Sequence, residues 1–268
     1  MTSHPDDAVL FSVDETTHIG VLTLNRPAQR NSMTAELLDA FAGASERARI
    51  HPTMRVLVVR GTGACFSSGA DFRSIVQRDD GPRASLPHER SFAMYVPFLS
   101  LRKIEVPVIG ALTGHAVGGG FGLALACDMR IASEDARYGA NFARLGLHPG
   151  LGIGYVLPRL IGLPRASELL YTGRLVSGRE AAELGMVNRA VVREEVMDEA
   201  IALAVEVARS APLAVRSMKR MMLAQLGWDV ERAAMEEALA QAATLQTNDV
   251  KEGIAALLEK RDPVFTGT

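Results

Sequence analysis

The first sixty residues alternate short apolar runs with one amphipathic stretch. The apolar runs Val9–Val13 and His18–Leu24 are joined by a short polar turn, and they predict two neighbouring strands. Thr34 can cap a helix that continues to Ile50, because the apolar residues of this stretch recur at helical spacing. The run Arg55–Arg60 predicts a third strand. The order strand, strand, helix, strand is a ββα unit rather than a strict βαβ alternation.

The middle of the chain is apolar and rich in glycine. The run Val106–Leu112 predicts a strand, and the segment Gly114–Gly122 follows it and leads into a small-residue stretch with helical potential. Glycines where a strand passes into a helix leave backbone N–H groups unpaired and unshielded by side chains. The helix dipole adds partial positive charge there, so the turn suits an anion or a carbonyl oxygen that becomes one. The alternative is a tight turn in which glycine only permits close packing.

The pattern continues as short strands and short helices as far as about residue 193. Strands are predicted at Met129–Ser133, Ala136–Gly139 and Met186–Val192. Between them, a second glycine-rich turn at Leu145–Gly152 precedes a helical stretch to Leu160. Shorter helices are predicted at residues 166–171 and 178–184.

From about Glu194 only helical periodicity remains, with breaks at Ala211-Pro212 and Gly227-Trp228 that predict three or four helices. We therefore divide the chain into a core of residues 1–198 and a helical region of residues 199–268. The helical region has more apolar surface than one layer of helices buries, which indicates contacts between subunits or packing against its own core. The apolar residues concerned are Leu223, Leu226, Met235, Leu239 and Leu245.

Composition places the chain among ordinary globular proteins. Of its 268 residues, 48% are hydrophobic and 22% are charged. A net charge of −2 gives no electrostatic reason to expect nucleic acid or a membrane as a partner. The polar, acidic beginning does not look like a signal peptide, and no apolar run approaches the roughly 18 residues of a membrane span. We therefore expect a cytoplasmic protein.

Several common site types have no match in the sequence. Cys65 and Cys127 have neither metal-ligand spacing nor a disulfide framework, so we expect buried, reduced thiols and no metal site. The glycine turns do not complete G-x-G-x-x-G, and no Walker lysine, G-x-S-x-G or H-E-x-x-H occurs. Dinucleotide binding, P-loop chemistry, an elbow-type serine hydrolase and a zinc centre are thereby disfavoured.

Three segments in order, Asn25–Met33, Phe66–Phe72 and Gly114–Gly120, resemble the enoyl-CoA hydratase/isomerase (crotonase) superfamily. The resemblance extends from about Val9 to Phe265. It implies an α/β fold, a spiral of ββα turns with a C-terminal helical region for trimerisation, and a homotrimer or homohexamer. It also implies an acyl-CoA thioester as substrate in lipid metabolism. Coenzyme A would then be part of the substrate, with no covalently bound cofactor.

The resemblance implies roles for individual residues. The backbone N–H groups of Ala70 and Gly119 would form an oxyanion hole for the thioester oxygen, each typically worth about 3 kcal/mol in the transition state. The coenzyme A moiety would be bound around Arg26, Ala28, Ser68, Asp71 and Lys260. Without the resemblance, Asp71 is a helix-cap candidate and Lys260 an ordinary solvated lysine.

The chain departs from the family pattern where acid/base groups are expected. Hydratases of the family carry two glutamates, and this chain has Gly122 and Phe142 at those positions. Hydration needs groups that activate water and handle the Cα proton, so standard hydratase and isomerase activity is in doubt. Gly150 stands where the halo-acyl-CoA hydrolases of the family have a nucleophilic aspartate. Phe142 would instead present an apolar face to the acyl chain.

His148 is the best titratable candidate to replace the glutamates, because histidine titrates near neutrality. The alternative is a histidine packed beside Pro149 for structural reasons. Weaker candidates share only titratable chemistry near the expected site; they are Tyr138, His115, His88, Glu89 and Tyr95. The sequence thus predicts a lyase or isomerase that stabilises a thioester enolate. The alternatives are a non-catalytic acyl-CoA binding or carrier protein, and an acyl-CoA decarboxylase.

Overall fold

The structure, a computed structural model, describes residues 7–71, 86–210, 212–261 and 263, with some residues of 212–244 described by their backbone alone. Its strands form two sheets. The first has the order β1 (Val9–Asp14), β2 (Ile19–Leu24), β3 (Val56–Gly61), β5 (Val108–Leu112), β7 (Met129–Ser133) and β10 (Arg189–Val191). The second has the order β4 (Cys65–Ser67), β6 (His115–Val117), β8 (Arg137–Gly139) and β9 (Val176–Ser177). Only the β1–β2 and β8–β9 pairs among these neighbours are antiparallel.

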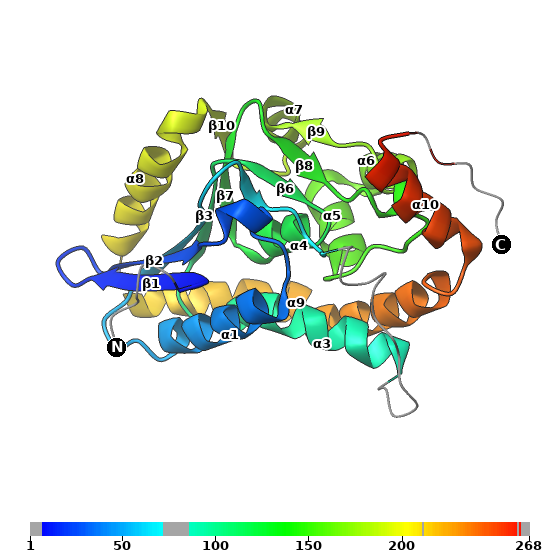
Figure 1. Ribbon diagram of the computed structural model, residues 1–268. Helices are drawn as coiled ribbons and strands as arrows, with labels where there is room; N and C mark the ends of the chain where they lie inside the picture. Colours follow the sequence, from blue (N-terminus) through cyan, green and yellow to red (C-terminus); the bar gives the residue numbers. More distant parts are fainter. Residues whose placement is uncertain (1–6, 72–85, 211, 262, 264–268) are drawn as a thin grey trace.

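Helices surround the sheets (Figure 1). The α-helices are α1 (Ala35–Arg49), α3 (Pro87–Leu99), α4 (Gly119–Ala126), α5 (Ile153–Ile161), α6 (Leu163–Thr172), α7 (Gly178–Leu184), α8 (Val196–Ala208), α9 (Pro212–Thr244) and α10 (Asn248–Glu259). The 3-10 turns are η1 (Pro27–Gln29), η2 (Ser100–Lys103), η3 (Phe142–Leu145) and η4 (Arg193–Glu195). The described segments thus give the mixed α/β architecture that the sequence predicts.

The initial ββα unit is confirmed. β1 and β2 pair antiparallel, α1 follows, and β3 then adds parallel to β2. The Thr34 hydroxyl accepts a hydrogen bond from the Leu37 N–H at 3.2 Å, which caps α1 where the sequence places its start. One apolar face of α1 is fully buried, with Leu37 and Phe41 among its residues. The polar stretch from Gln77 to Pro87, which contains Gly81-Pro82, predicts a loop, and its residues up to position 85 lie outside the described part of the chain.

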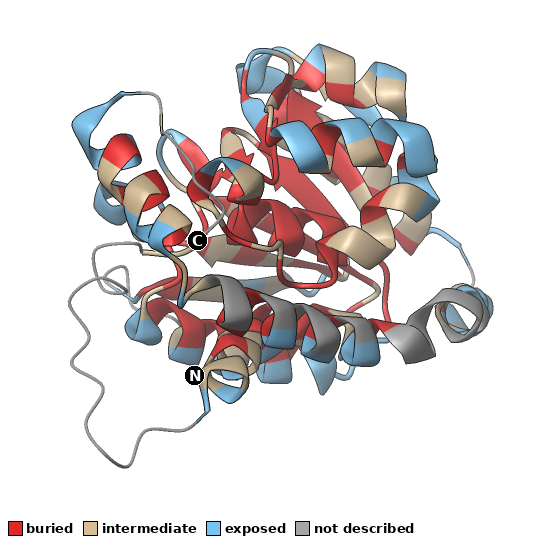
Figure 2. Ribbon diagram, turned by 90° about the vertical axis from the view of Figure 1, so that its right-hand side faces the viewer, coloured by how far each residue is buried: buried red, intermediate tan, exposed pale blue. Residues whose placement is uncertain are grey.

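The first sheet is covered on both faces, which explains why β5 is buried at every position. On one face α8 packs its buried alanines against side chains of β2, β3, β5 and β7. Figure 1 shows α1, α3 and α9 running side by side below the sheet, and α3 packs closely on α9. Figure 2 shows buried residues on the strands and inner helix faces, with exposed residues outside. The division predicted at residues 198/199 falls within α8.

α9 corrects one prediction. The sequence predicts a helix break at Gly227-Trp228, but α9 is helical without interruption over 33 residues. A glycine inside a helix costs only about 1 kcal/mol relative to alanine. Tertiary contacts offset this cost, because α9 lies along α3 and contacts α5. The helical region therefore consists of α8, α9 and α10 in the described part of the chain.

A buried lysine fastens the first half of α9 to the sheet. The Lys219 Nζ lies 2.7 Å from Asp128 Oδ2 and donates to the Val106 carbonyl at 2.8 Å. The same Asp128 oxygen accepts from the Val108 N–H at 2.7 Å. Since Asp128 follows α4 and Val108 begins β5, one ion pair links α9, α4 and the central strand.

Candidate active site

The glycine turn between β6 and α4 leaves a backbone N–H at the start of the helix. Gly118 caps α4 with φ 57° and ψ −121°, a conformation that L side chains rarely adopt. Its own N–H is used, since it donates to the Gly139 carbonyl at 3.0 Å. α4 then begins at Gly119, whose N–H has no hydrogen-bond partner among the described residues. The first N–H groups of a helix carry the positive end of its dipole.

Ala70 lies next to this turn because the preceding loop is tied down on both sides. The Gly69 carbonyl accepts from the Met33 N–H at 2.8 Å, and the Gly69 N–H donates to the Ser67 hydroxyl at 3.3 Å. A Cβ atom on Gly69 would lie 2.6 Å from the Gly119 nitrogen, so the two loops are in close contact. The Ala70 N–H likewise has no partner in the described part of the chain.

Asn31 holds the loop of η1 against the end of β4, a role that residue type and spacing alone do not indicate. Its side chain donates to the carbonyls of Thr62 and Cys65 at 3.0 and 2.9 Å, and it accepts from the Arg26 N–H at 2.8 Å. The Asn31 carbonyl accepts from the Ser67 hydroxyl at 2.8 Å. Because the Asn31 side chain is completely buried, this network fixes the loop that carries Ala70.

The opposite end of α4 is also anchored. The buried Arg130 guanidinium donates to the carbonyls of Ala124 and Cys127 at 3.3 and 2.6 Å, and to the Met186 carbonyl at 2.8 Å. Burial lowers the pKa of Arg130. A cation at the carboxyl end of a helix interacts favourably with its dipole. α4 is therefore fixed at both ends, and the direction of the Gly119 N–H is fixed with it.

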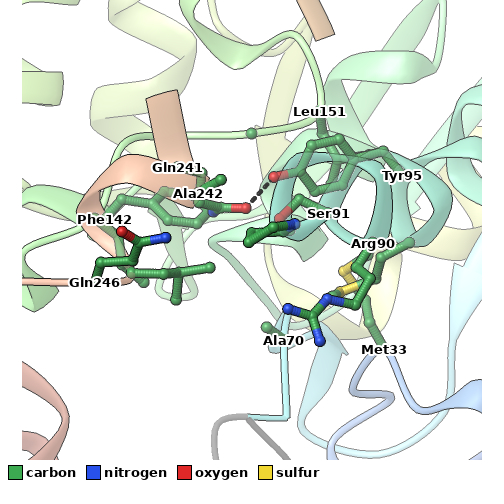
Figure 3. Close-up of a pocket in the computed structure, with 16 residues that line it drawn as sticks. Met33, Ala70, Arg90, Ser91, Tyr95, Phe142, Leu151, Gln241, Ala242 and Gln246 are labelled. Atoms are coloured by element: carbon green, nitrogen blue, oxygen red, sulfur yellow. Dashed lines mark hydrogen bonds between the residues drawn. The ribbon is translucent and has the colours of Figure 1, made fainter. Parts of the chain in front are cut away.

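A cavity of about 290 Å³ opens beside Ala70 and Gly119. Figure 3 shows it with the residues that line it. Most of the lining side chains are apolar. The full lining comprises Met33, Ala70, Pro87, Arg90, Ser91, Met94, Tyr95, Gly119, Phe142, Leu147, Gly150, Leu151, Gln241, Ala242, Leu245 and Gln246. Both residues expected to form the oxyanion hole thus line the same largely apolar cavity.

The resemblance implies glutamates at positions 122 and 142 in hydratases, and the structure has apolar groups at both places. Phe142 is buried, lines the cavity, and lies against the glycine turn, since a Cβ on Gly118 would be 3.7 Å from the Phe142 Cζ. A Cβ on Gly122 would lie 2.6 Å from the Leu151 Cβ and 2.8 Å from its Cδ1. Leu151 therefore occupies the space that a side chain at position 122 would need.

Tyr95 does the same at position 150. A Cβ on Gly150 would lie 2.4 Å from the Tyr95 hydroxyl oxygen, so a side chain there would have to displace the Tyr95 ring. The Tyr95 hydroxyl donates to Gln241 Oε1, and Gln241 Nε2 donates to the His148 carbonyl at 3.3 Å. Figure 3 shows the Tyr95–Gln241 hydrogen bond at the cavity. Tyr95 is only a weaker titratable candidate by sequence and Gln241 is not singled out, because the two residues lie 146 positions apart.

His148 is placed beside the cavity lining rather than in it. Leu147 and Gly150, on either side of it in the chain, line the cavity, but His148 does not. Its half-buried ring has Nδ1 at 2.7 Å from the Pro149 carbonyl, which corresponds to the structural alternative given above. A catalytic role for His148 stays a prediction.

The other titratable candidates are either engaged in hydrogen bonds or lie outside the cavity lining. The buried Tyr138 hydroxyl donates to the Leu112 carbonyl at 2.9 Å, and burial raises its pKa. Burial lowers the pKa of His115, whose Nδ1 accepts from the Arg137 N–H at 2.9 Å. His88 and Glu89 lie in the first turn of α3 and do not line the cavity.

The residues expected to bind coenzyme A are spread over three segments. Ala28 is exposed in η1, and Ser68 is half-buried and donates its N–H to the Arg30 carbonyl at 3.0 Å. The Arg26 guanidinium is paired with Glu36. Asp71 is half-buried next to Ala70. Lys260 is exposed at the end of α10 with φ 57°.

Comparison with known proteins gives consistent matches along nearly the whole chain. Residues 14–268 match the family profile described as enoyl-CoA hydratase/isomerase. A Thermus thermophilus protein with the provisional name of enoyl-CoA hydratase is 38% identical over 248 residues, covering 92% of this chain and 97% of its own. The chain belongs to the enoyl-CoA hydratase/isomerase family.

Solved structures show the family fold directly. An enoyl-CoA hydratase/isomerase from Pseudoalteromonas atlantica superposes with a TM-score of 0.84 at 29% identity, covering 97% of this chain and 100% of that one. EchA1_1 of Mycobacterium paratuberculosis also gives 0.84, at 32% identity, covering 98% and 99%. The fold is therefore that of the enoyl-CoA hydratases, as the resemblance implies.

The described residues were also compared with the features of membrane-spanning helices, metal sites and disulfides. In the described ranges no helix is both long and apolar enough to cross a membrane. Among the same residues no three His, Cys, Asp or Glu side chains are grouped as metal ligands would be. Cys65 and Cys127 are buried free thiols, as predicted.

Proposed function

We propose that this family member binds an acyl-CoA thioester and stabilises its enolate with the N–H groups of Ala70 and Gly119. The observation that carries the proposal is that Ala70 and Gly119, whose N–H groups have no partner in the described part of the chain, line one largely apolar cavity. Such a pair suits an oxygen that gains negative charge as the Cα proton or a Cα substituent leaves. With Gly122 and Phe142 in place of glutamates, hydration of a double bond lacks its acid and base.

A substitution of Ala70 tests the oxyanion hole. Ala70→Pro removes the N–H donor, whereas Ala70→Gly retains it. We expect Ala70→Pro to lower kcat by roughly 100-fold or more with any turned-over thioester, and Ala70→Gly to retain most of it. Thermal unfolding of both variants reports whether the fold is intact. Equal loss in both variants, or no loss in a folded Ala70→Pro, contradicts the role.

The substrates for this test come from a panel of enoyl-, 3-hydroxyacyl- and malonyl-type CoA thioesters. Turnover is followed by chromatography, and binding by calorimetry. Tight binding without turnover across the panel supports the non-catalytic carrier function instead. In the same assays His148→Ala tests the histidine, and unchanged turnover removes it from the mechanism.

Arg90 favours decarboxylation as the second candidate function. Of the described residues that line the cavity, it is the one with a permanent positive charge, and Figure 3 shows its guanidinium at the cavity. A guanidinium can hold a carboxylate on the acyl group. Loss of CO2 would then leave the bonding electron pair in the thioester enolate, which the two N–H groups stabilise and a solvent proton quenches. CO2 release from malonyl-type thioesters, reduced in Arg90→Met, tests it.

We also propose that the chain assembles as a homotrimer or homohexamer. Several large apolar side chains of the helical region are exposed in the single chain. They are Met218, Met222, Met235, Leu239, Leu257 and Leu258. By contrast, Leu245 lines the cavity. Light scattering of the purified protein measures the mass, and a monomer of 28.8 kDa contradicts the proposal.

A further inference from the structure

The thioether of Met33 lies against the backbone of Gly119. A Cβ atom on Gly119 would be only 2.3 Å from the Met33 Sδ, and 3.5 Å from the Gly69 Cα. Since a carbon–carbon bond is about 1.5 Å long, the sulfur itself lies within about 4 Å of the Gly119 Cα. Met33 is also linked to the residue before Ala70, because its N–H donates to the Gly69 carbonyl at 2.8 Å. Met33 therefore contacts both backbone segments that carry the N–H groups of the expected oxyanion hole.

The side chain of Met33 is also part of the cavity wall. It keeps 6% of its surface exposed and lines the cavity of about 290 Å³ together with Ala70 and Gly119. The oxidation of a side-chain sulfur depends on access of the oxidant, and hydrogen peroxide is far smaller than the acyl group that this cavity suits. Met218 and Met222 of α9 are exposed and do not line the cavity, so they report oxidation that is independent of it.

Oxidation by hydrogen peroxide adds one oxygen atom to the Met33 sulfur. The S–O bond forms as the O–O bond of the peroxide breaks, so the sulfur loses two electrons and the peroxide is reduced to water. An apolar side chain thereby becomes a polar one with a hydrogen-bond acceptor. The new oxygen would lie one bond from Sδ, beside the Gly119 N–H, which has no partner among the described residues. A donor and an acceptor placed side by side in a largely apolar cavity favour a hydrogen bond, because leaving either unpaired costs free energy.

We propose that Met33 is an oxidation site whose sulfoxide closes the oxyanion hole to the thioester oxygen. The sulfoxide oxygen accepts from the Gly119 N–H and takes the space in which the thioester oxygen would be held. The inference rests on the proposed function, because an acyl-CoA thioester is the ligand that loses its place. It adds to that function a chemical modification by peroxide that weakens substrate binding.

The test measures the affinity for hexanoyl-CoA by calorimetry before and after treatment with hydrogen peroxide, which is removed before the titration. Peptide mass spectrometry identifies the oxidised methionines. We expect the wild type to bind hexanoyl-CoA at least about tenfold more weakly once Met33 is oxidised. Hexanoyl-CoA present during the treatment should slow the oxidation of Met33 but not that of Met218 and Met222.

Three variants separate the sulfur from its surroundings. Met33→Leu removes the oxidisable atom, so peroxide treatment should change the affinity of this variant by less than about twofold. Met33→Gln places an amide oxygen near Gly119 without oxidation and should bind about tenfold more weakly than Met33→Leu. Met94→Leu is the matched control, because Met94 also lines the cavity but is not one of the three groups nearest to a Cβ at position 119. This control should stay as sensitive to peroxide as the wild type.

The outcomes separate this inference from the proposed function. If Met33 becomes oxidised and the affinity for hexanoyl-CoA is unchanged, the inference is wrong and acyl-CoA binding stands. It is also wrong if Met33 stays reduced while Met218 and Met222 are fully oxidised, or if peroxide weakens binding by Met33→Leu as it does in the wild type. If the untreated wild type does not bind hexanoyl-CoA, both proposals fail. Thermal unfolding of each variant and of the oxidised protein shows that a lost affinity does not come from a lost fold.

Discussion

Gly122 and Leu151 compete for one volume, and this competition can be measured. A Cβ on Gly122 would lie 2.6 Å from the Leu151 Cβ, well inside the roughly 3.5–4.0 Å at which carbon atoms pack. The Leu151 Cβ is attached to the backbone, so no change of rotamer moves it away. We predict that Gly122→Ala destabilises the protein, although alanine is the better helix former and position 122 lies inside α4.

The size of the effect follows from the local geometry. Overpacking a core costs about 1–3 kcal/mol, and the gain in helix propensity returns about 0.5–1 kcal/mol. Leu151→Gly alone removes a buried leucine side chain, which lowers the free energy of unfolding by about 2–5 kcal/mol. About 1 kcal/mol of this loss is offset, because Leu151 has φ 60° and glycine adopts that backbone conformation without strain. In the double variant the overlap is gone, so Gly122→Ala should become neutral or stabilising. We expect a coupling energy of about 2 kcal/mol.

Urea unfolding of the wild type, both single variants and the double variant measures this cycle. Gly43→Ala is the matched control, because Gly43 lies inside α1 and a Cβ there meets only the end of Arg47 at 3.9 Å. It should stabilise by about 0.5–1 kcal/mol. If the two substitutions at positions 122 and 151 add within about 0.5 kcal/mol, the claim that they share one volume is refuted.

Three further predictions concern α9, the buried thiol and the coenzyme A site. Lys219→Met leaves Asp128 without its cation and should lower the free energy of unfolding by about 2 kcal/mol. This cost is smaller than for a fully buried ion pair, because Asp128 is partly exposed to solvent. The exposed Lys251→Met serves as control and should change it by less than about 0.5 kcal/mol in the same urea titration. Burial raises the pKa of Cys127 to about 12, so the thiol form is favoured in the folded state. Stability is then fully present below the unfolded pKa of about 9 and is lost toward pH 12, by up to about 1.4 kcal/mol per pH unit. Cys127→Ala should remove that slope from the difference between the two unfolding curves, and identical slopes would contradict it. Lys260→Ala should weaken acyl-CoA binding several-fold at low salt and much less at 0.5 M salt, because an exposed charge is screened. Calorimetry at both salt concentrations decides, and equal losses speak against a phosphate contact.

Local features of the site were predictable from the sequence because they depend on neighbouring residues. The strand entering the Gly114–Gly122 segment, the helix leaving it and the cap at Thr34 all follow from spacing and residue type. The break predicted at Gly227 was wrong for the complementary reason. Contacts of α9 with α3 and α5 stabilise the helix there, and nothing local in the sequence records them.

The lining of the cavity was not predictable to the same degree. Gln241 reaches it from α9 and Tyr95 from α3, and only the tertiary packing of these two helices brings them together. One signal in the sequence could have helped. The residues of α3 that line the cavity share one helical face at i, i+3, i+4, i+7 and i+8. They are Pro87, Arg90, Ser91, Met94 and Tyr95.

Gly122 and Gly150, where the resemblance implies a glutamate and an aspartate in other family members, each lie against a larger side chain. Leu151 fills the space beside Gly122, and Tyr95 fills the space beside Gly150. A site that had only lost its acid/base groups would be left with voids, and voids cost roughly 24 cal/mol per Å³. Here the space is repacked, and one of the replacing groups is a hydroxyl that donates to Gln241. The shape of the cavity therefore depends on Leu151 and Tyr95 rather than on side chains at positions 122 and 150.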